Sequence, residues 1–540
     1  MLSTLSSTAA PTLERPVRDP KAAVPRRADW GMIPSSLGEA ARRKGIGGTA
    51  YDTAWVAGVP SQSDLRSSQF PTALSWLVDN QLPDGSWGSP IRYEPDRVLS
   101  TLAALASLAT FGRSDREQRA VAAGTRYLWQ HGDRLGLEPT EPVGFELLLP
   151  TLIRRAQLAG VGVPSNLDIY GPQRAAKLRL IPPHALYSPD VTTVHSLEFL
   201  GEQADWGRLG SAQGANGSIG NSPAATAFYA SRTHEPRALA YLENCLRRNG
   251  GCSAPVLYPC DTFEMLWSAY HLFLAGVPAS RLLNAGERAG LREALRGDGV
   301  SLASSFPIPD ADDTAVALLL LHSLGERVDP SVLERFVSGC GHFVSYPFER
   351  HSSVGVNLHV LHALARIPGY SASSATIAGI VDYLGDRRID GAYWLDKWHV
   401  SPIYATAHAV CALSELPIPY MKAAQPLIDG AHAWLCDLQR ADGSWGWHEQ
   451  STLEETAYAA LALAVLNRTS RYVGDLERRH AGVRYIEGTM RGEGGLGSQA
   501  CYPPMWIDKC LYTPPLVVRS AVRAALIANL ELGAMGPRIA

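Results

Sequence analysis

The sequence predicts an all-α fold, because its apolar residues gather in long segments rich in Ala and Leu with little β-branched alternation. Segments 314–324, 454–466 and 516–532 are of this kind, and Gly or Pro residues separate them from their neighbours. Several are apolar nearly all round, which is typical of helices buried between two layers. Strand patterns are scarce along the whole chain.

A short repeat joins these helical segments. The sequence QLPDGSW at 81–87 returns as QRADGSW at 439–445, and a degenerate copy, QGANGSI, lies at 213–219. Gly supplies a positive φ and the Asp or Asn side chain bonds its own backbone, so each copy predicts a turn between helices. The Gln and Trp are expected to tie neighbouring hairpins together. Repeated helical hairpins predict an α/α barrel of paired helices, in which the repeat is structural.

Composition sets the broad class of the protein. The 540 residues are enough for two or three domains, and 46% hydrophobic with 19% charged residues indicates an ordinary soluble globular protein. A net charge of −3 makes a nucleic acid an unexpected partner. The eight cysteines include no C-x-x-C pair, which favours reduced thiols and a cytoplasmic location over a disulfide framework or zinc finger.

The chain shows no clear targeting or membrane segment. Residues 1–28 are rich in Ser, Ala, Pro and Arg without an apolar core, which predicts disorder rather than a secretory signal. An organelle transit peptide is an alternative, although this segment is short and contains Glu14 and Asp19. No run of 18 apolar residues exists, so no segment is expected to span a membrane.

Three carboxylates stand just before an apolar run, in the sequence Asp310-Ala311-Asp312-Asp313. Grouped acids repel one another and are costly to desolvate, so at least one carboxyl is expected to be protonated near neutral pH. A neutral carboxylic acid facing an apolar pocket can protonate an isolated alkene. The alternative interpretation is a helix N-cap with acids favoured by the helix dipole.

Together with the repeat, this acid motif resembles the superfamily of squalene-hopene cyclases and class II diterpene cyclases. The closer resemblance, over residues 47 to 530, is to copalyl diphosphate synthase-type class II cyclases. It is carried, in the same order along the chain, by YDTAWVA at 51–57, GFE at 144–146, KL and IP at 177–182, HSLE at 195–198, SPAATA at 222–227, YPCDTFE at 258–264, DKWH at 396–399 with SP at 401–402, and WIDK at 506–509.

The resemblance implies two helical α/α barrel domains, called β and γ, with the active site between them. Residues 29–46 would form the first helix of the β domain, 47–258 an inserted γ domain, and 259–540 the rest of the β domain with the acid motif. The D-D-x-x-D motif of class I terpene synthases is absent. The diphosphate is therefore expected to stay on the product, as a substrate for a downstream class I terpene synthase.

In this family the middle Asp of the acid motif is the general acid, which is Asp312 here. Burial and the neighbouring Asp310 and Asp313 are expected to raise its pKa, and one of these neighbours can orient its proton. Aromatic faces suit the cations that follow. The candidates are Trp394, Trp398 and Tyr404, each of which is also explained as a core residue.

The resemblance places cations for the diphosphate at Lys177 and Lys397, with Lys509 and Arg491 as further candidates. Plant members have an acidic Mg²⁺-binding cluster before Gly-Phe-Glu, and here the thinner counterpart at 138–146 offers Glu141 and Glu146. Carboxylates in a Pro-rich loop can reach a hydrated Mg²⁺ that bridges the phosphates.

Termination of the reaction is less well defined by the resemblance. Plant ent-copalyl diphosphate synthases hold a water between His and Asn to remove the final proton. His195 matches that His, but Val256 stands where the Asn is expected. His195 can act alone as the base or be a buried histidine bonded to the backbone.

The function implied is cyclisation of geranylgeranyl diphosphate to a copalyl-type, labdane diphosphate. The alternatives are a rearranged halimane or clerodane product, and a drimane made from farnesyl diphosphate. A noncatalytic prenyl-binding scaffold such as a prenyltransferase β-subunit is disfavoured by the acid motif and by the lack of an Asp/Cys/His zinc pattern. A membrane-bound triterpene cyclase is disfavoured by the lysines and the sparse repeats.

Overall fold

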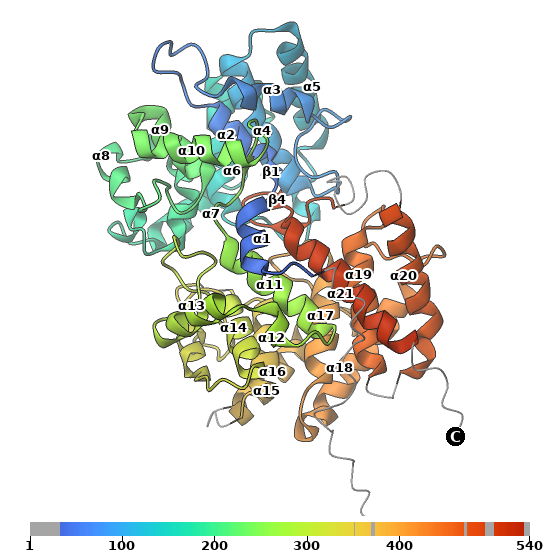
Figure 1. Ribbon diagram of the computed structural model, residues 1–540. Coiled ribbons are helices and arrows are strands. Elements are labelled where there is room, and N and C mark those ends of the chain that lie inside the picture. Colours follow the sequence, from blue (N-terminus) through green and yellow to red (C-terminus); the bar gives the residue numbers. More distant parts are fainter. Residues whose placement is uncertain (1–32, 350, 369–372, 469–471, 492–501, 534–540) are drawn as a thin grey trace, which may run out of the picture.

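The computed structural model describes residues 33–349, 351–368, 373–468, 472–491 and 502–533. Within them nearly all regular structure is helical, as predicted (Figure 1). The three apolar segments singled out in the sequence form α14 (Ala311–Ser323), α19 (Leu453–Asn467) and α21 (Pro515–Gly533). The predicted disordered segment 1–28 lies outside the described residues.

The first half of the chain forms a closed inner ring, in which each helix packs against the next and the last returns to the first. The ring consists of α2 (Ala50–Ala57), α4 (Glu94–Phe111), α6 (Phe145–Leu158), the 3-10 helix η5 (Thr192–Gln203) and α9 (Pro223–Thr233). Outer helices cover it: α3 (Pro71–Asp79), α5 (Asp115–His131), α7 (Gly171–Leu180) and α10 (Pro236–Arg248). Short helices complete this half: η2 (Leu135–Leu137), η3 (Ser165–Leu167), η4 (Ala185–Tyr187), α8 (Trp206–Leu209) and η6 (Gly210–Ala212).

The second half forms another closed ring, below the first in Figure 1. Its inner helices are α11 (Asp261–Leu274), α14, α15 (Val354–Arg366), α17 (Pro402–Ser414), α19 and α21. The other helices of this half are α12 (Ala279–Leu282), α13 (Ala285–Arg296), η7 (Pro330–Phe336), α16 (Ser373–Asp386), α18 (Ile418–Asp437), η8 (Val473–Asp475) and α20 (Leu476–Arg491). Because an inner helix is covered on every side, α17 and α19 are buried along nearly their whole lengths, which explains their uniformly apolar sequences.

Two features connect the rings. Helix α1 (Leu37–Lys44) precedes the first ring in sequence yet packs against α11 and α21 of the second. Strand β1 (Gly48–Thr49) pairs antiparallel with β2 (Ala254–Pro255), so the chain enters and leaves the first ring at one place. Strands β3 (Trp506–Ile507) and β4 (Leu511–Tyr512) form a second small hairpin. The rings correspond to the expected γ and β domains, whose exact boundaries stay a prediction.

The repeated turns do what their sequence predicts. Asp84 and Asp442 each accept a hydrogen bond from a backbone N–H two residues on, at 3.0 Å. Gln81 Nε2 donates to the carbonyl of Ala120 on α5, and Gln439 Nε2 donates to that of Arg478 on α20, so each Gln ties its turn to the next helix. Gly85 has a φ of 91° and packs against the backbone of Ala123, where a Cβ has no room.

Trp394 belongs to this structural set, which supports the core interpretation that was the alternative for it. Its indole N–H donates to the carbonyl ten residues earlier at 2.7 Å, as those of Trp87 and Trp445 do. In all three, the backbone N–H donates to a Thr hydroxyl on the following inner helix. Trp394 is fully buried and is committed to holding a turn.

Candidate active site

The acid motif occupies the N-terminus of the inner helix α14. Asp310 is the N-cap, and its Oδ1 accepts a hydrogen bond from the backbone N–H of Asp313 at 2.8 Å. Asp310 and Asp313 are buried, whereas Asp312 keeps 13% of its side-chain surface exposed. The capping interpretation therefore applies to Asp310, and Asp312 is the more exposed carboxyl, to which the acid interpretation is confined.

Electrostatics raise the pKa of all three acids of the motif. Burial, and then the neighbouring Asp312, raise the pKa of Asp310 to about 8. Burial and the charge of Asp310 hold the pKa of Asp313 well above its ordinary value. Burial also raises the pKa of Asp312, although His359 acts in the opposite direction. The shift of Asp312 is thus in the direction that a general acid requires.

The partner of Asp312 is a histidine on the neighbouring inner helix, not another aspartate of the motif as expected. His359 Nδ1 on α15 lies 2.7 Å from Asp312 Oδ1. His359 Nε2 lies 3.3 Å from Nδ1 of His408 on α17, whose Nε2 is 3.2 Å from Nε2 of His271 on α11. Burial lowers the pKa of His271 to about 3 and that of His408 well below its usual value, so both rings are neutral. A chain of histidines therefore backs the acid.

Aromatic rings surround this chain. Trp267 packs edge-on to His359 with ring centres 4.5 Å apart, and Tyr404 lies 4.3 Å from the ring of His408. Trp506 lies 5.2 Å from Tyr404. Trp398, the third predicted aromatic, is partly buried, donates to Ser345 Oγ at 3.3 Å and has Lys397 Nζ 4.7 Å from its ring centre. Tyr404 thus lies beside the acid's histidines, and Trp398 beside a predicted phosphate-binding lysine.

The two lysines predicted first for the diphosphate are partly exposed, and each is paired with a glutamate. Lys177, in the last turn of α7, lies 2.5 Å from Glu146 Oε1 at the start of α6. Lys397 lies 2.7 Å from Glu349 Oε2, and its positive charge acts to lower the pKa of Asp312. Glu141 accepts a hydrogen bond from the hydroxyl of Tyr170, beside α7. Lys177, Glu141 and Glu146 therefore lie on adjoining parts of the first ring.

The other two cations have different roles, and their predictions as phosphate ligands are wrong. Lys509 is fully buried, and its Nζ donates to Glu198 at 2.9 Å, Ser222 Oγ at 2.6 Å and the carbonyl of His195 at 3.0 Å, which uses all three protons. Arg491 lies on the exposed face of α20 and pairs with Glu487 on the same helix.

His195 lies beside Lys509, whose Nζ bonds its carbonyl, in the group of side chains that links the two rings. Its Nδ1 lies 2.9 Å from the carbonyl of Gly220, and its Nε2 lies 3.2 Å from the Asp508 carboxylate. Burial acts to lower the pKa of His195, but Asp508 outweighs it and the pKa is raised. Both ring nitrogens of His195 are thus engaged, one by a backbone carbonyl and the other by the Asp508 carboxylate, and its role as the terminating base stays a prediction. Val256 is fully buried in the apolar core, and its side chain has no atom that could hydrogen-bond a water.

The His195–Asp508 pair makes stability depend on pH in a defined direction. A raised histidine pKa stabilises the fold below the ordinary value near 6.5 and loses this contribution as pH rises through the folded pKa. The lowered pKa of Asp508 keeps its carboxylate charged throughout this range. We expect His195→Gln to lower the thermal unfolding midpoint most at about pH 6 and progressively less toward about pH 9.

The matched control for this prediction is His184→Gln, because His184 is exposed. It should leave the midpoint unchanged at every pH. A deficit of His195→Gln that grows as the pH rises would show that the pair is not an ion pair.

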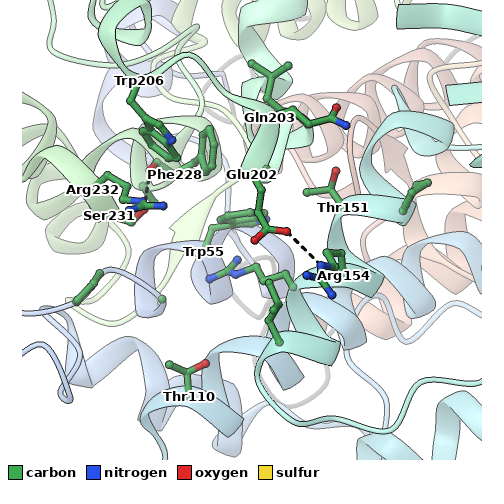
Figure 2. Close-up of a pocket in the computed structure, with 18 of the residues that line it drawn as sticks. Trp55, Thr110, Thr151, Arg154, Glu202, Gln203, Trp206, Phe228, Ser231 and Arg232 are labelled. Carbon is green, nitrogen blue, oxygen red and sulfur yellow. Dashed lines mark hydrogen bonds and ion pairs between the residues drawn. The ribbon is translucent and has the colours of Figure 1, made fainter. Parts of the chain in front are cut away.

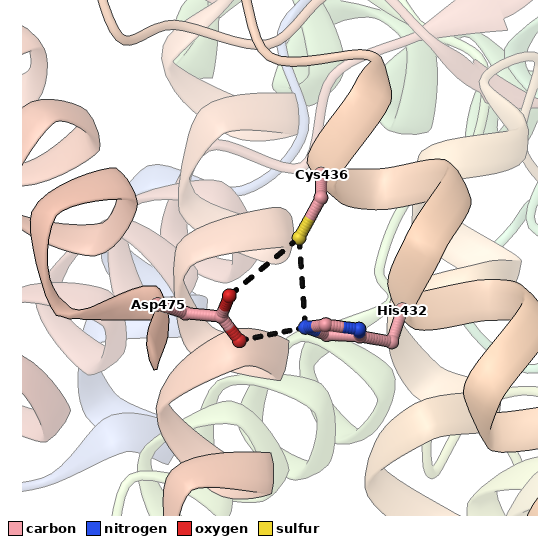
Figure 3. Close-up of side chains that lie close together, drawn as sticks. All are labelled: His432, Cys436 and Asp475. Carbon is pink, nitrogen blue, oxygen red and sulfur yellow. Dashed lines mark hydrogen bonds and ion pairs between the residues drawn. The ribbon is translucent and has the colours of Figure 1, made fainter. Parts of the chain in front are cut away.

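A His/Cys/Asp group does exist among the described residues, although the sequence contains no zinc-like spacing. His432 and Cys436 on α18 face Asp475 of η8, with His432 Nε2 2.6 Å from Asp475 Oδ2 (Figure 3). Cys436 Sγ lies 3.5 Å from His432 Nε2. The hydrogen bond between His432 and Asp475 already satisfies both groups, which serve the packing of α18 against η8.

None of the helices in the described segments is both long and apolar enough to cross a bilayer.

Comparison with known proteins gives a consistent set of relatives. Residues 349–499 match the squalene-hopene cyclase C-terminal domain family. A type B diterpene cyclase of Mycobacterium tuberculosis is 34% identical over 521 residues, which cover 91% of this chain and 97% of the relative. An ent-copalyl diphosphate synthase of Streptomyces sp. KO-3988 is 33% identical over 476 residues, covering 85% and 88%. The solved structure of ent-copalyl diphosphate synthase from Streptomyces platensis aligns with a TM-score of 0.74 at 28% identity, covering 91% of this chain and 98% of that one.

Proposed function

The chain belongs to the class II diterpene cyclase family, and we propose that it cyclises geranylgeranyl diphosphate to a bicyclic, copalyl-type diphosphate that keeps its diphosphate group. The observation that carries this proposal is Asp312: a carboxyl with a raised pKa, more accessible than Asp310 and Asp313, bonded to His359 and surrounded by aromatic rings. The C20 chain length is favoured by the similarity to a diterpene cyclase and to ent-copalyl diphosphate synthases.

The reaction begins with transfer of the Asp312 proton to the terminal alkene. With His359 Nδ1–H donating to Oδ1, the acidic proton resides on Oδ2. The same hydrogen bond stabilises the carboxylate left behind, because it strengthens as negative charge develops. The low pKa values of His408 and His271 keep both rings neutral. The Asp312 proton is therefore not passed along the chain of histidines and stays available to the substrate.

The carbocation then moves along the chain as the rings close. Water would capture such a cation, and aromatic faces stabilise it without offering a lone pair of comparable reactivity. Tyr404, Trp267 and Trp506 supply these faces beside the acid, and Trp398 supplies one beside Lys397.

The diphosphate is assigned to Lys177 and Lys397, where it would replace the glutamates that now pair with them. Glu141 and Glu146 fit a Mg²⁺ ion in their donor chemistry, since this ion prefers carboxylate oxygen and retained water. The ion would offset the charge of the diphosphate. Because the group stays attached, a class I terpene synthase is the kind of enzyme that would act next.

A second product class, a rearranged skeleton, is favoured by the residues that stand where the final proton would be removed. Val256 is buried in the apolar core, and both ring nitrogens of His195 are already engaged by Gly220 and Asp508. Neither residue offers a free basic atom to remove the final proton of a copalyl-type cascade. Slow deprotonation leaves time for hydride and methyl shifts, which lead to halimane or clerodane skeletons.

Incubation with C15, C20 and C30 substrates, followed by phosphatase treatment and product identification, tests the proposal. We expect conversion of the C20 diphosphate to a bicyclic alcohol after phosphatase treatment, with no inorganic diphosphate released during turnover. Release of inorganic diphosphate would contradict the class II chemistry. A drimane from the C15 substrate alone would move the activity to farnesyl diphosphate, and a rearranged skeleton would favour the second product class.

Lys177→Ala tests the assigned phosphate site. Losing a charge-assisted hydrogen bond should raise the KM for geranylgeranyl diphosphate about 10- to 100-fold, with a smaller effect on kcat. Lys422→Ala, which removes an exposed lysine from α18, is the matched control and should behave as wild type. An unchanged KM in Lys177→Ala would remove Lys177 from the site.

A further inference from the structure

The first ring contains a cavity of about 580 Å³ at the end that faces away from the link between the rings (Figure 2). Helix α2 shows this arrangement: Asp52 near its start lies 3.8 Å from Lys509, whereas Trp55 and Gly58 near its end line the cavity. Helix α9 repeats it, since its N-cap Ser222 accepts from Lys509 and its last turn lines the cavity. An eleven-residue helix is about 16 Å long, so Arg232 in the last turn of α9 lies well away from Ser222 and Lys509, whereas Arg155 is close enough to Glu198 to be affected by its charge.

The cavity contains arginines that lack acidic partners among the described residues. Glu202 pairs with Arg154 at 3.1 Å, which is the ion pair drawn in Figure 2. Arg155 instead stacks on Trp55 at 3.8 Å and donates to Ser107 Oγ at 3.3 Å, while its buried Nη1 has no hydrogen-bond partner. Burial lowers the pKa of Arg155 to about 10, although the nearby Tyr51 and Glu198 act in the opposite direction, so the charge of the guanidinium is only partly compensated.

Two further arginines line the same cavity and add positive charge to it. Arg174 of α7 donates to the carbonyl of Phe199 at 2.9 Å and to Gln203 Oε1 at 3.2 Å, and its buried Nε has no partner. Arg232 lies over the ring of Trp206 at 5.1 Å. Planar guanidiniums bind phosphate oxygens in a bidentate manner, and partial burial strengthens that interaction.

The rest of the lining is apolar and aromatic, from Trp55, Trp206, Phe228, Leu158 and Leu200. Leu158 is 59% exposed, so an apolar side chain at the cavity is not covered by other residues. A volume of about 580 Å³ lies within the range of small-molecule sites. Unpaired guanidiniums beside apolar walls define a ligand with an anionic head and a hydrocarbon tail.

We propose that this cavity is a second, noncatalytic binding site for an alkyl or prenyl phosphate, whose head group pairs with Arg155, Arg174 and Arg232 while the chain lies against Trp55, Trp206 and Phe228. The site does not depend on the chemistry at Asp312. Its occupants include the free phosphorylated chain of a substrate or product and any other phosphate-bearing lipid of similar size.

Calorimetric titration of the full chain with decyl phosphate, below its micelle concentration, tests the site without any turnover. We expect saturable binding in the micromolar range. Decanol lacks the anion and inorganic phosphate lacks the chain, so each should bind at least about tenfold more weakly. Arg155→Gln combined with Arg232→Gln should weaken decyl phosphate binding about 10- to 100-fold.

Three further variants locate the binding in this cavity. Arg126→Gln removes an exposed arginine of α5 outside the cavity and should leave the affinity unchanged. Repeating the titrations in Lys397→Ala removes a contribution from the assigned diphosphate site, and the loss caused by the arginine substitutions should persist. Arg232→Gln alone changes an exposed residue, which keeps the test possible if the double variant does not fold. Equal affinity in wild type and folded arginine variants, or no binding of decyl phosphate, would overturn the proposal.

Discussion

Asp312→Asn is expected to reduce kcat by about 10³- to 10⁴-fold, because an amide keeps the shape of the carboxyl but has no acidic proton. The fold should be unchanged: a protonated acid is replaced by a neutral group of the same size, and the partly exposed side chain caps no helix. The measurement is single-turnover conversion of geranylgeranyl diphosphate, with circular dichroism and thermal unfolding as checks on structure. A folded variant that keeps more than about a tenth of wild-type activity would exclude Asp312 as the acid.

The neighbours of Asp312 distinguish acid chemistry from helix capping. Asp310→Asn keeps an N-cap side chain but removes one of the charges that raise the pKa of Asp313. His359→Ala removes the hydrogen bond that lowers the pKa of Asp312, so activity should fall about 10- to 100-fold. Because the acid then holds its proton to higher pH, the alkaline limb of the pH–rate profile should move upward. A merely structural role for His359 would leave that limb in place.

The helical architecture could be predicted from the sequence because local chemistry dictates it. Inner helices of an α/α barrel are covered on all sides and are therefore apolar nearly all round. They can be recognised from this pattern without knowing which helices cover them. The turn at 81–87 carries its own geometry in Asp-Gly-Ser, and the structure confirms its hydrogen bonds. The structural role of Trp394 is not apparent from the sequence because its turn has one more residue between Gly and Trp, with Asp390 and Gly391 both at positive φ. The same structural role is therefore hidden in a different spacing.

The position of the Asp312 carboxyl at the start of an apolar helix could be predicted, but its surroundings could not. Asp312 follows from the spacing of three acids before an apolar helix, whereas His359 lies 47 positions further along the chain. The signal in the sequence is a polar residue in an apolar helix, and α15 gives this signal three times. Asn357 bonds the backbone of Phe343 and His362 bonds Tyr270, so only the fold shows that His359 is the residue that contacts the acid.

Lys509 shows how a sequence-based assignment can fail. The family resemblance offers Lys509 as a further phosphate ligand, yet its ammonium lies in the interior between the two rings. Motifs that carry the family resemblance meet there: Tyr51 donates to Glu198, and Lys509 bonds both Glu198 and Ser222. Part of that resemblance therefore reflects the junction of the rings rather than the reaction.

Replacing Lys509 with Met should lower the unfolding free energy by about 3–5 kcal/mol, the largest stability effect expected in the molecule. The substitution removes the only ammonium in contact with Glu198 and Asp52 among the described residues, both of which have fully buried side chains. Burial already raises the pKa of Asp52 to about 6 in the presence of Lys509. Without the lysine, both carboxyls must take up protons or remain buried as uncompensated charges. Thermal and denaturant unfolding midpoints measure the loss.

The pH dependence and a second substitution separate lost charge from lost packing. Native carboxyls with raised pKa values bind more protons than the unfolded chain, so stability of Lys509→Met should fall as the pH rises from about 4 to about 8. Adding Glu198→Gln should restore part of the stability at neutral pH, because it neutralises one of the orphaned carboxyls while keeping its shape. Lys422→Met, at an exposed position of α18, is the matched control and should cost little. The prediction would be contradicted if Lys509→Met were as stable as the wild type at pH 7.5, or if adding Glu198→Gln lowered its stability further. Either result would show that the buried ion pair of Lys509 does not stabilise the junction of the rings.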